Sequence, residues 1–284
     1  MSVLTASVEF VSRIVEMEAE LAKPVILGVC GPQGSGKTYL SEHLDEEIRT
    51  RFPKLNCVKF SMDDLYLTHD EQAKLTEESE MTNNLLLQGR GLPGTHDVNL
   101  GIEILNKLKY WDGTPVDIPI YDKSAFSGEG DRTSSFQVST RPDIIIFEGW
   151  FNGFQPLDED QVRVRYLTSK ATQSCLQKHK LYDVLDVNET LQSYKKIWDM
   201  FDYFIYLDSD YKNVYKWRLE QEHDLIAKSG SGMTDEQVVK FIDRYIPVYE
   251  LYYDDMCEKG CVTEGQNLRL VIGENRELLV VQIV

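Results

Sequence analysis

Residues 31–38 read Gly-Pro-Gln-Gly-Ser-Gly-Lys-Thr and match the pattern G-x4-G-K-[ST] in full. Glycines let a backbone wrap around a phosphate with its N–H groups pointing inward, and the start of a helix adds a favourable dipole. In such a P-loop, Lys37 would bridge the β- and γ-phosphates and the Thr38 hydroxyl would ligate Mg²⁺. We therefore predict that ATP binds to Gly31, Pro32, Gln33, Gly34, Ser35, Gly36, Lys37, Thr38 and Tyr39.

The residues on either side of this motif decide its meaning, because the pattern also occurs by chance. The apolar run Val25–Cys30 precedes it and is typical of a strand buried on both faces. After it, apolar residues recur every four positions, as on the buried face of a helix: Leu40, Leu44, Ile48 and Phe52. This order of strand, loop and helix favours a phosphate site over an ordinary strand-to-helix turn.

Carboxylates follow two further apolar runs. Glu148 ends the run after Asp143, in the Walker-B arrangement of a second metal ligand. Asp63 and Asp64 follow the run that begins at Cys57, where a carboxylate can take the proton of a hydroxyl attacking a phosphate. Neighbouring strand residues point in different directions, so we assign the base to Asp63 and a helix cap or metal role to Asp64, although the reverse stays open. The predicted catalytic residues are Lys37, Asp63 and Glu148, and the predicted metal ligands are Thr38, Asp64 and Glu148.

The composition narrows the class of protein. The chain has 284 residues, of which 42% are hydrophobic, enough for one large α/β domain with a core. Its 30 basic and 47 acidic residues give a net charge of −17, so we expect neither nucleic acid nor a membrane as partner. Five scattered cysteines indicate free thiols, and we expect a soluble, cytoplasmic protein. The oligomeric state is open.

Six short apolar runs alternate with helical patterns along the chain. The runs span residues 25–30, 57–62, 144–147, 203–207, 268–272 and 278–284, and helical patterns after the P-loop helix span residues 100–109, 189–200, 211–227 and 234–257. Alternation of this kind predicts an α/β P-loop NTPase fold, with a doubly wound, mainly parallel sheet flanked by helices. The exception is residues 82–140, an irregular segment that we expect to carry function.

Five ordered motifs make the sequence recognisable. They are Ser61–Thr68, Gly89–Asp97, Ile118–Ser124, Gly128–Arg132 and Glu148–Phe154. Together they resemble the plant-type D-glycerate 3-kinase family and its fungal relatives, P-loop kinases related to phosphoribulokinase, uridine kinase and pantothenate kinase. The resemblance runs from about Val25 to near the C-terminus. It implies ATP-dependent phosphorylation of a small hydroxylated molecule, with D-glycerate as the leading acceptor and Asp63 as the base.

The irregular segment supplies the expected acceptor contacts. Arg90 and His96 lie in a glycine-rich loop and can hold an anionic group, since a bidentate arginine suits a carboxylate. The loop aspartates have turn chemistry as an alternative role. The predicted acceptor-binding residues are Arg90, His96, Asp97, Tyr121, Lys123 and Arg132.

The chain is interpreted as a single kinase domain, 1–284, with an N-terminal helix at 1–23, acceptor loops at 82–140 and a helical lid at 217–245. In the resembling kinases the lid carries basic residues onto the phosphates and excludes water. Arg218 and Lys228 are the candidates here, with Arg244 further along, and a helix–loop–helix with solvated charges is the alternative. Two other functions stay open: an ATP-binding regulator with little catalytic activity, and a nucleoside or pantothenate-type kinase.

Overall fold

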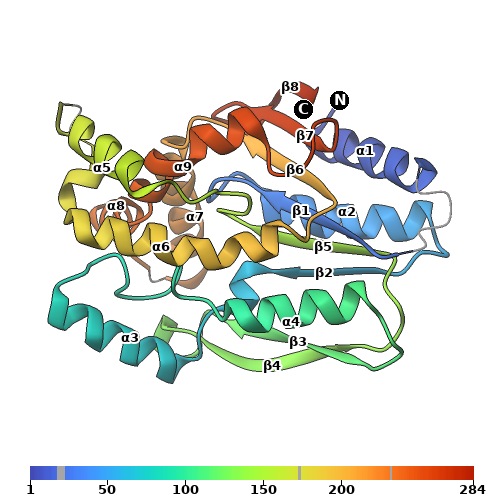
Figure 1. Ribbon diagram of the computed structural model, residues 1–284, viewed down its shortest axis with the longest axis horizontal. Helices are drawn as coiled ribbons and strands as arrows, with labels where there is room; N and C mark the ends of the chain where they lie inside the picture. The colour runs from blue at the N-terminus through green and yellow to red at the C-terminus, as the bar shows by residue number, and fades with distance from the viewer. Residues whose placement is uncertain (18–22, 172–173, 231) are drawn as a thin grey trace.

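The computed structural model describes residues 1–17, 23–171, 174–230 and 232–284. At its centre is a six-stranded sheet with the strand order β2-β5-β1-β6-β7-β8 (Figure 1). The strands are β1 Val25–Cys30, β2 Cys57–Ser61, β5 Ile144–Gly149, β6 Tyr203–Asp208, β7 Asn267–Ile272 and β8 Leu278–Ile283. All pairs are parallel except β7 with β8. Each strand lies where an apolar run predicted it, so the predicted α/β fold with a mainly parallel sheet is confirmed.

Both faces of the sheet are covered by helices. Leu27 of β1 faces one core cluster, with α1 (Val3–Met17) and α2 (Lys37–Arg51), whereas Ile26 faces the other, with α4, α6 and α9. Burial of both faces explains why the central strands read as continuous apolar runs. The edge strand β8 is the exception, because its apolar residues are largely exposed. The remaining helices are α3 His69–Thr82, α4 Val98–Lys109, α5 Glu159–Thr168, α6 Leu181–Trp198, α7 Asn213–Ser229, α8 Asp235–Asp243 and α9 Ile246–Lys259.

Several expected boundaries shift in the structure. The N-terminal helix expected at 1–23 ends at Met17, and residues 18–22 lie outside the described part of the chain. The helical pattern at 234–257 is two helices, because the chain turns at Arg244–Tyr245 and α9 starts with a proline in its first turn. No helix among the described residues is long and apolar enough to cross a membrane.

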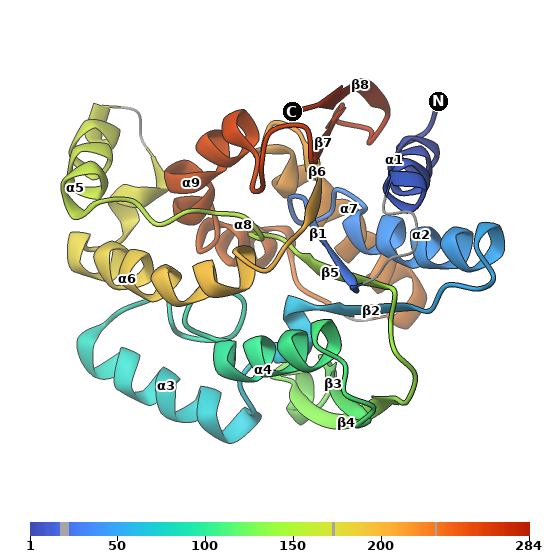
Figure 2. The same cartoon turned by 45° about the vertical axis from the view of Figure 1, so that its right-hand side comes forward.

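The segment expected to be irregular is more ordered than its composition indicates. It contains α4 and an antiparallel hairpin of β3 (Val116–Asp122) and β4 (Asp131–Val138). The sequence hides this hairpin because β3 contains Pro119 and β4 is largely polar and exposed. Together with α3, the hairpin lies beyond the β2 edge of the sheet (Figures 1 and 2). The helical pattern predicted at 100–109 is thus confirmed as α4, whereas the hairpin corrects the expectation of an irregular segment.

Two glycines shape the turn between β1 and α2. Gly34 and Gly36 have φ angles of 80° and 93°, in the left-handed region that favours glycine. A Cβ on Gly34 would lie 2.5 Å from Cβ of the fully buried Trp217, whereas a Cβ on Gly36 would meet nothing within 4 Å. Trp217 belongs to α7, so this helix and the P-loop touch at Gly34.

We expect Gly34→Ala to destabilise the protein more than Gly36→Ala. Both changes place alanine in a left-handed conformation, at a cost of about 1 kcal/mol. Only Gly34→Ala also pushes against Trp217, which should add about 1–3 kcal/mol. Urea unfolding of the two variants and the wild type measures this difference, and equal losses would contradict the close packing of Gly34 on Trp217.

Candidate active site

The strand register brings Glu148 next to the P-loop. Glu148 is level with Val29 of β1 on one side and with Ser61 of β2 on the other. The Thr38 hydroxyl donates a hydrogen bond to Glu148 Oε2 at 3.2 Å. Glu148 is only 5% exposed, and this burial raises its pKa against the opposing charge of Lys37. A buried carboxylate beside a hydroxyl is a pair of hard oxygen donors, which suits Mg²⁺.

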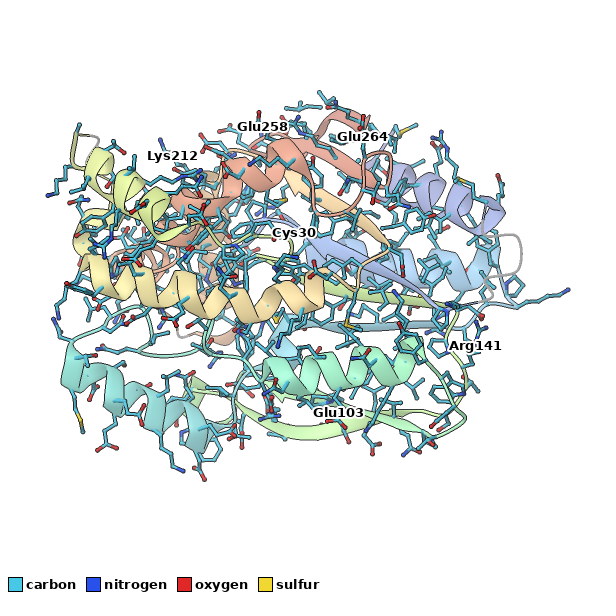
Figure 3. The ribbon with its side chains drawn as sticks, in the orientation of Figure 1. Cys30, Glu103, Arg141, Lys212, Glu258 and Glu264 are labelled. Atoms are coloured by element: carbon cyan, nitrogen blue, oxygen red, sulfur yellow. The ribbon has the colours of Figure 1, made fainter. Side chains whose placement is uncertain are left out.

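Residues from other parts of the chain hold the P-loop by hydrogen bonds, and within the described part of the chain the loop retains one buried hydroxyl without a partner. Arg276 Nε donates to the Gly34 carbonyl at 2.7 Å, and the Tyr249 hydroxyl accepts from the Gln33 amide at 3.1 Å. Cys30, at the end of β1, lies in the interior of the molecule (Figure 3), where its thiol donates to the Trp150 carbonyl. Among the described residues, the buried Ser35 hydroxyl has no hydrogen-bond partner. An unpaired buried donor in a glycine-rich loop fits a site for phosphate oxygens.

The two neighbouring aspartates have different surroundings. Asp64 caps the short 3₁₀ helix Met62–Leu65: its Oδ2 accepts from the amide and hydroxyl of Ser61, at 2.8 and 2.9 Å. Asp63 lines the large cavity beside the P-loop, where its Oδ2 lies 2.5 Å from Lys123 Nζ. Asp64 lines only a smaller neighbouring cavity, and both oxygens of its carboxylate already accept hydrogen bonds, from Ser61 and from the Tyr121 amide, so we no longer assign it to the metal.

The ion pair sets the protonation state of Asp63. Burial raises the pKa of this carboxyl. The charges of Lys123 and Lys37 and a hydrogen bond from the Tyr66 hydroxyl lower it by a larger amount, so the pKa lies below its ordinary value. Asp63 is therefore ionised at neutral pH. An ionised carboxylate at the end of β2, facing the P-loop, can accept a proton from a hydroxyl brought to the same cavity.

The cavity beside the P-loop has a volume of about 910 Å³. Its walls come from the P-loop, Asp63, Glu148, the loops 88–90 and 123–129, one side of α3, the helices α7 and α8, and residues 244–245, which follow α8. A smaller cavity of about 340 Å³ adjoins it and shares five wall residues with it: Thr38, Ser61, Asp63, Lys123 and Glu148. The pair of Asp63 and Lys123 thus lies where the two spaces meet.

Arg90 lines the large cavity, but its guanidinium is already engaged. It donates to the carbonyls of Lys123, Gly128 and Glu129, and lies 5.6 Å from the centre of the Tyr121 ring. These bonds hold the loop that carries Lys123. Arg90 therefore supports the acceptor wall rather than offering a free fork to a carboxylate, which corrects the expectation from the sequence. Tyr121 lines only the smaller cavity, and its hydroxyl donates to the Glu129 carbonyl at 3.2 Å.

Three predicted acceptor residues lie behind the cavity walls. His96 is buried, with Nδ1 2.9 Å from the Tyr194 hydroxyl, and burial lowers its pKa to about 3, so the ring is neutral. Asp97 caps α4, and Arg132 pairs with Asp97 at 3.5 Å and with Glu71 at 3.1 Å. Since none of the three lines either cavity, we do not retain His96, Asp97 or Arg132 as acceptor ligands.

The predicted lid residues separate in the same way. Arg218 lines the large cavity and pairs with Glu222 at 3.1 Å. Arg244 lines it too and donates to the carbonyls of Gln88 and Arg90. Lys228 is exposed in the last turn of α7 and does not line the cavity, so the two arginines are the better candidates. Tyr39 also lines the cavity and stacks on His43, with ring centres 3.8 Å apart.

One wall of the cavity was missed from the sequence. It is the side of α3 that carries Gln72, Thr76, Glu77 and Glu80. The helix has a weak apolar pattern, but its start is marked: the Thr68 hydroxyl accepts from the Glu71 amide, and the Glu71 carboxylate accepts from the Thr68 amide. This capping box is a sequence signal that would have located α3.

We expect His96→Asn to make the protein less sensitive to acid. The ordinary pKa of 6.5 falls to about 3 on folding, so the unfolded chain binds the proton first. Stability from the neutral ring is complete above pH 6.5 and is lost as the pH falls towards 3. Between pH 7 and pH 5 the free energy of unfolding should therefore fall by about 2 kcal/mol more in the wild type than in the variant. Urea unfolding at the two pH values checks this, and parallel losses would contradict a buried neutral His96.

Similar proteins, rather than a family model, place the chain in a family. No family model matches the sequence, but several kinases are similar to it. The probable ATP-dependent kinase TDA10 of Saccharomyces cerevisiae is 38% identical over 98% of this chain and 95% of its own length. The chloroplastic D-glycerate 3-kinase of Arabidopsis thaliana is 36% identical over 84% of this chain, which spans about half (49%) of the plant protein.

A solved structure gives the same result for the whole fold. D-glycerate 3-kinase from Cryptococcus neoformans superposes with a TM-score of 0.92, at 34% identity and with complete coverage of both chains. Phosphoribulokinase from Rhodobacter is only 11% identical and shares the fold alone, with a TM-score of 0.51. The resemblance seen in the five sequence motifs is thus confirmed, and the chain belongs to the D-glycerate 3-kinase family of ATP-dependent P-loop kinases.

Proposed function

We propose that this kinase transfers the γ-phosphate of ATP to a hydroxyl of a small anionic acceptor, with D-glycerate as the leading candidate. The observation that carries the proposal is the ionised Asp63 in the cavity shared with Lys37 and Glu148, 2.5 Å from the cation of Lys123. A base, a phosphate loop and a cation for the acceptor then line one space. The similarity to the D-glycerate 3-kinases of Arabidopsis thaliana and Cryptococcus neoformans supports glycerate as the acceptor.

The P-loop would hold the phosphates of ATP with its backbone N–H groups and Lys37. Thr38 and Glu148 would hold Mg²⁺, because their hydroxyl and carboxylate oxygens lie together and the buried Glu148 lacks full charge compensation. When bound, this ion would neutralise negative charge on the phosphates during the transfer.

Asp63 would accept the proton of the acceptor hydroxyl. The acceptor oxygen forms a bond to the γ-phosphorus while the bond from that phosphorus to the β–γ bridging oxygen breaks, and its electron pair leaves with ADP. Asp63 holds the transferred proton, and its ionised state before the reaction fits this role.

Arg218 and Arg244 would shield the reacting groups from water. Both lie on the lid segment that borders the cavity, and both are positioned by bonds to protein groups rather than free in solvent. Lid residues placed this way exclude water and limit the hydrolysis of ATP. On the same ground we propose that residues 217–245 form the lid of a single domain, 1–284. Residue 231 of this segment lies outside the described part of the chain.

A reducing compartment such as the cytoplasm suits the cysteines. All five are free, and three of them are buried. Free thiols persist where glutathione and thioredoxin keep them reduced, which supports a cytoplasmic location. The net charge of −17 argues against nucleic acid as a partner.

Asp63→Asn should lower kcat about 10²–10⁴-fold with D-glycerate, because the base can no longer take the proton. The Kd for ATP should be unchanged, whereas Lys37→Ala should weaken ATP binding itself. ADP release with Mg²⁺-ATP and D-glycerate, with phosphoglycerate identified as product, measures the first effect, and titration calorimetry with ATP measures the second.

Asp64→Asn is the matched control, because the side-chain oxygen of asparagine can still accept from Ser61 in the capping box and residue 64 does not line the large cavity. Its kcat should stay close to that of the wild type. Full activity of Asp63→Asn would exclude the base assignment. Tight ATP binding without turnover of glycerate, sugars, nucleosides or pantothenate would favour the regulatory alternative.

A further inference from the structure

Five cationic side chains of lysine and arginine line the large cavity in the described part of the chain: Lys37, Arg90, Lys123, Arg218 and Arg244. Three of them are arginines engaged with protein groups. Arg90 and Arg244 donate to backbone carbonyls, and Arg218 pairs with Glu222. Lys37 belongs to the phosphates of ATP in any P-loop. Lys123 is therefore the cation left for an anionic acceptor.

The backbone of Lys123 is held in place by hydrogen bonds, whereas its side chain is exposed and flexible. Its carbonyl accepts from Arg90 at 3.4 Å, and the same arginine holds Gly128 and Glu129 of this loop. His69 Nε2 lies 2.7 Å from Glu129 Oε2, which ties the loop to α3 as well. The side chain of Lys123 is 59% exposed, and a lysine stem has several rotatable bonds. The ammonium group can thus change partner while the loop stays in place.

We infer that Lys123 recognises the carboxylate of the acceptor and that it leaves Asp63 to do so. This inference rests on the proposed function. The acceptor hydroxyl must come within about 3 Å of Asp63 to give up its proton. Lys123 Nζ lies 2.5 Å from the same carboxylate, so a short hydroxy acid meets the base with its hydroxyl and the cation with its carboxylate.

The exchange would couple recognition to the reaction. In the structure Lys123 pairs with Asp63, which lowers the basicity of that carboxylate. When the acceptor binds, its carboxylate forms an ion pair with the Lys123 ammonium group in place of Asp63. Asp63 is then free to accept the proton of the acceptor hydroxyl. Lys123 keeps its own protons throughout, and the phosphorus–oxygen bonds change as in the step above. A neutral acceptor offers no competing charge, so Asp63 would stay paired.

The experiment compares D-glycerate with glycerol, which has the same terminal hydroxyl and no carboxylate. The kcat/KM of each acceptor is measured at saturating Mg²⁺-ATP for the wild type, Lys123→Gln and Lys123→Arg. With D-glycerate, Lys123→Gln should lose about 10- to 100-fold in kcat/KM, the size expected for one charged hydrogen bond. With glycerol it should be unchanged or faster, because Asp63 is no longer paired. Lys123→Arg should keep most of the preference for D-glycerate.

Lys59→Gln is the matched control. Lys59 lines only the smaller cavity and pairs with Glu42 at 3.5 Å, so the ratio of the two acceptors should not change. Titration with ATP and thermal unfolding verify that each variant is folded and binds nucleotide. Removal of an exposed lysine leaves the core untouched, so loss of folding is not expected.

An equal loss on both acceptors in Lys123→Gln would overturn the inference, because Lys123 would then only support Asp63. An undiminished preference for D-glycerate would overturn it as well. Failure of the wild type with D-glycerate would instead contradict the proposed acceptor, whatever the variants do. The same variants are then tested on the acceptor that the screen identifies, and an acceptor without an anionic group would end the inference.

Discussion

The parallel pairing of β1 with β5, and of β5 with β2, is the constraint on which the site depends. It places Val29, Glu148 and Ser61 on one level across three strands, so that the residues following each strand emerge at one edge of the sheet. The P-loop follows β1 and Asp63 follows β2. Parallel strands have this property in general, because their carboxyl ends coincide. The strand register alone therefore brings together the P-loop, the buried Glu148 and Asp63, for which we propose the role of base.

Charge is distributed unevenly between the surface of this protein and its cavity. The chain as a whole carries a net charge of −17, yet lysines and arginines from several elements line the cavity. The arginines are used structurally: Arg90 and Arg244 hold neighbouring loops through carbonyls, and Arg276 holds the P-loop. The forked guanidinium suits such multiple bonds, whereas a lysine is a compact charge on a flexible stem. This difference fits the roles that we propose for the two lysines, Lys37 with the phosphates and Lys123 with the acceptor.

The segment between β2 and β5 turns a nucleotide-binding sheet into a site with an acceptor side. The wall formed by α3 and the loop 123–130 stands opposite the P-loop, and Arg90 and His69 tie this wall together. Phe126 and Ser127 in that loop have positive φ angles, which the bonds of Arg90 to the neighbouring carbonyls help to maintain. The position of Lys123 is thus set by contacts far apart in the sequence.

Local sequence signals were sufficient to predict the six strands of the main sheet, the P-loop and the positions of Asp63 and Glu148. Strands buried on both faces read as continuous apolar runs, and the phosphate loop has a local pattern, so both signals lie within a few neighbouring residues. The contacts of four other residues appear only in the folded chain: Arg90, His96, Asp97 and Arg132. Whether a loop arginine faces a cavity or a carbonyl depends on residues some 30 to 40 positions away, as for Arg90 with Lys123 and Glu129, and no local periodicity records such a contact. The polar hairpin of β3 and β4 was not predicted for a related reason: the pairing of its strands, rather than their composition, makes it a sheet.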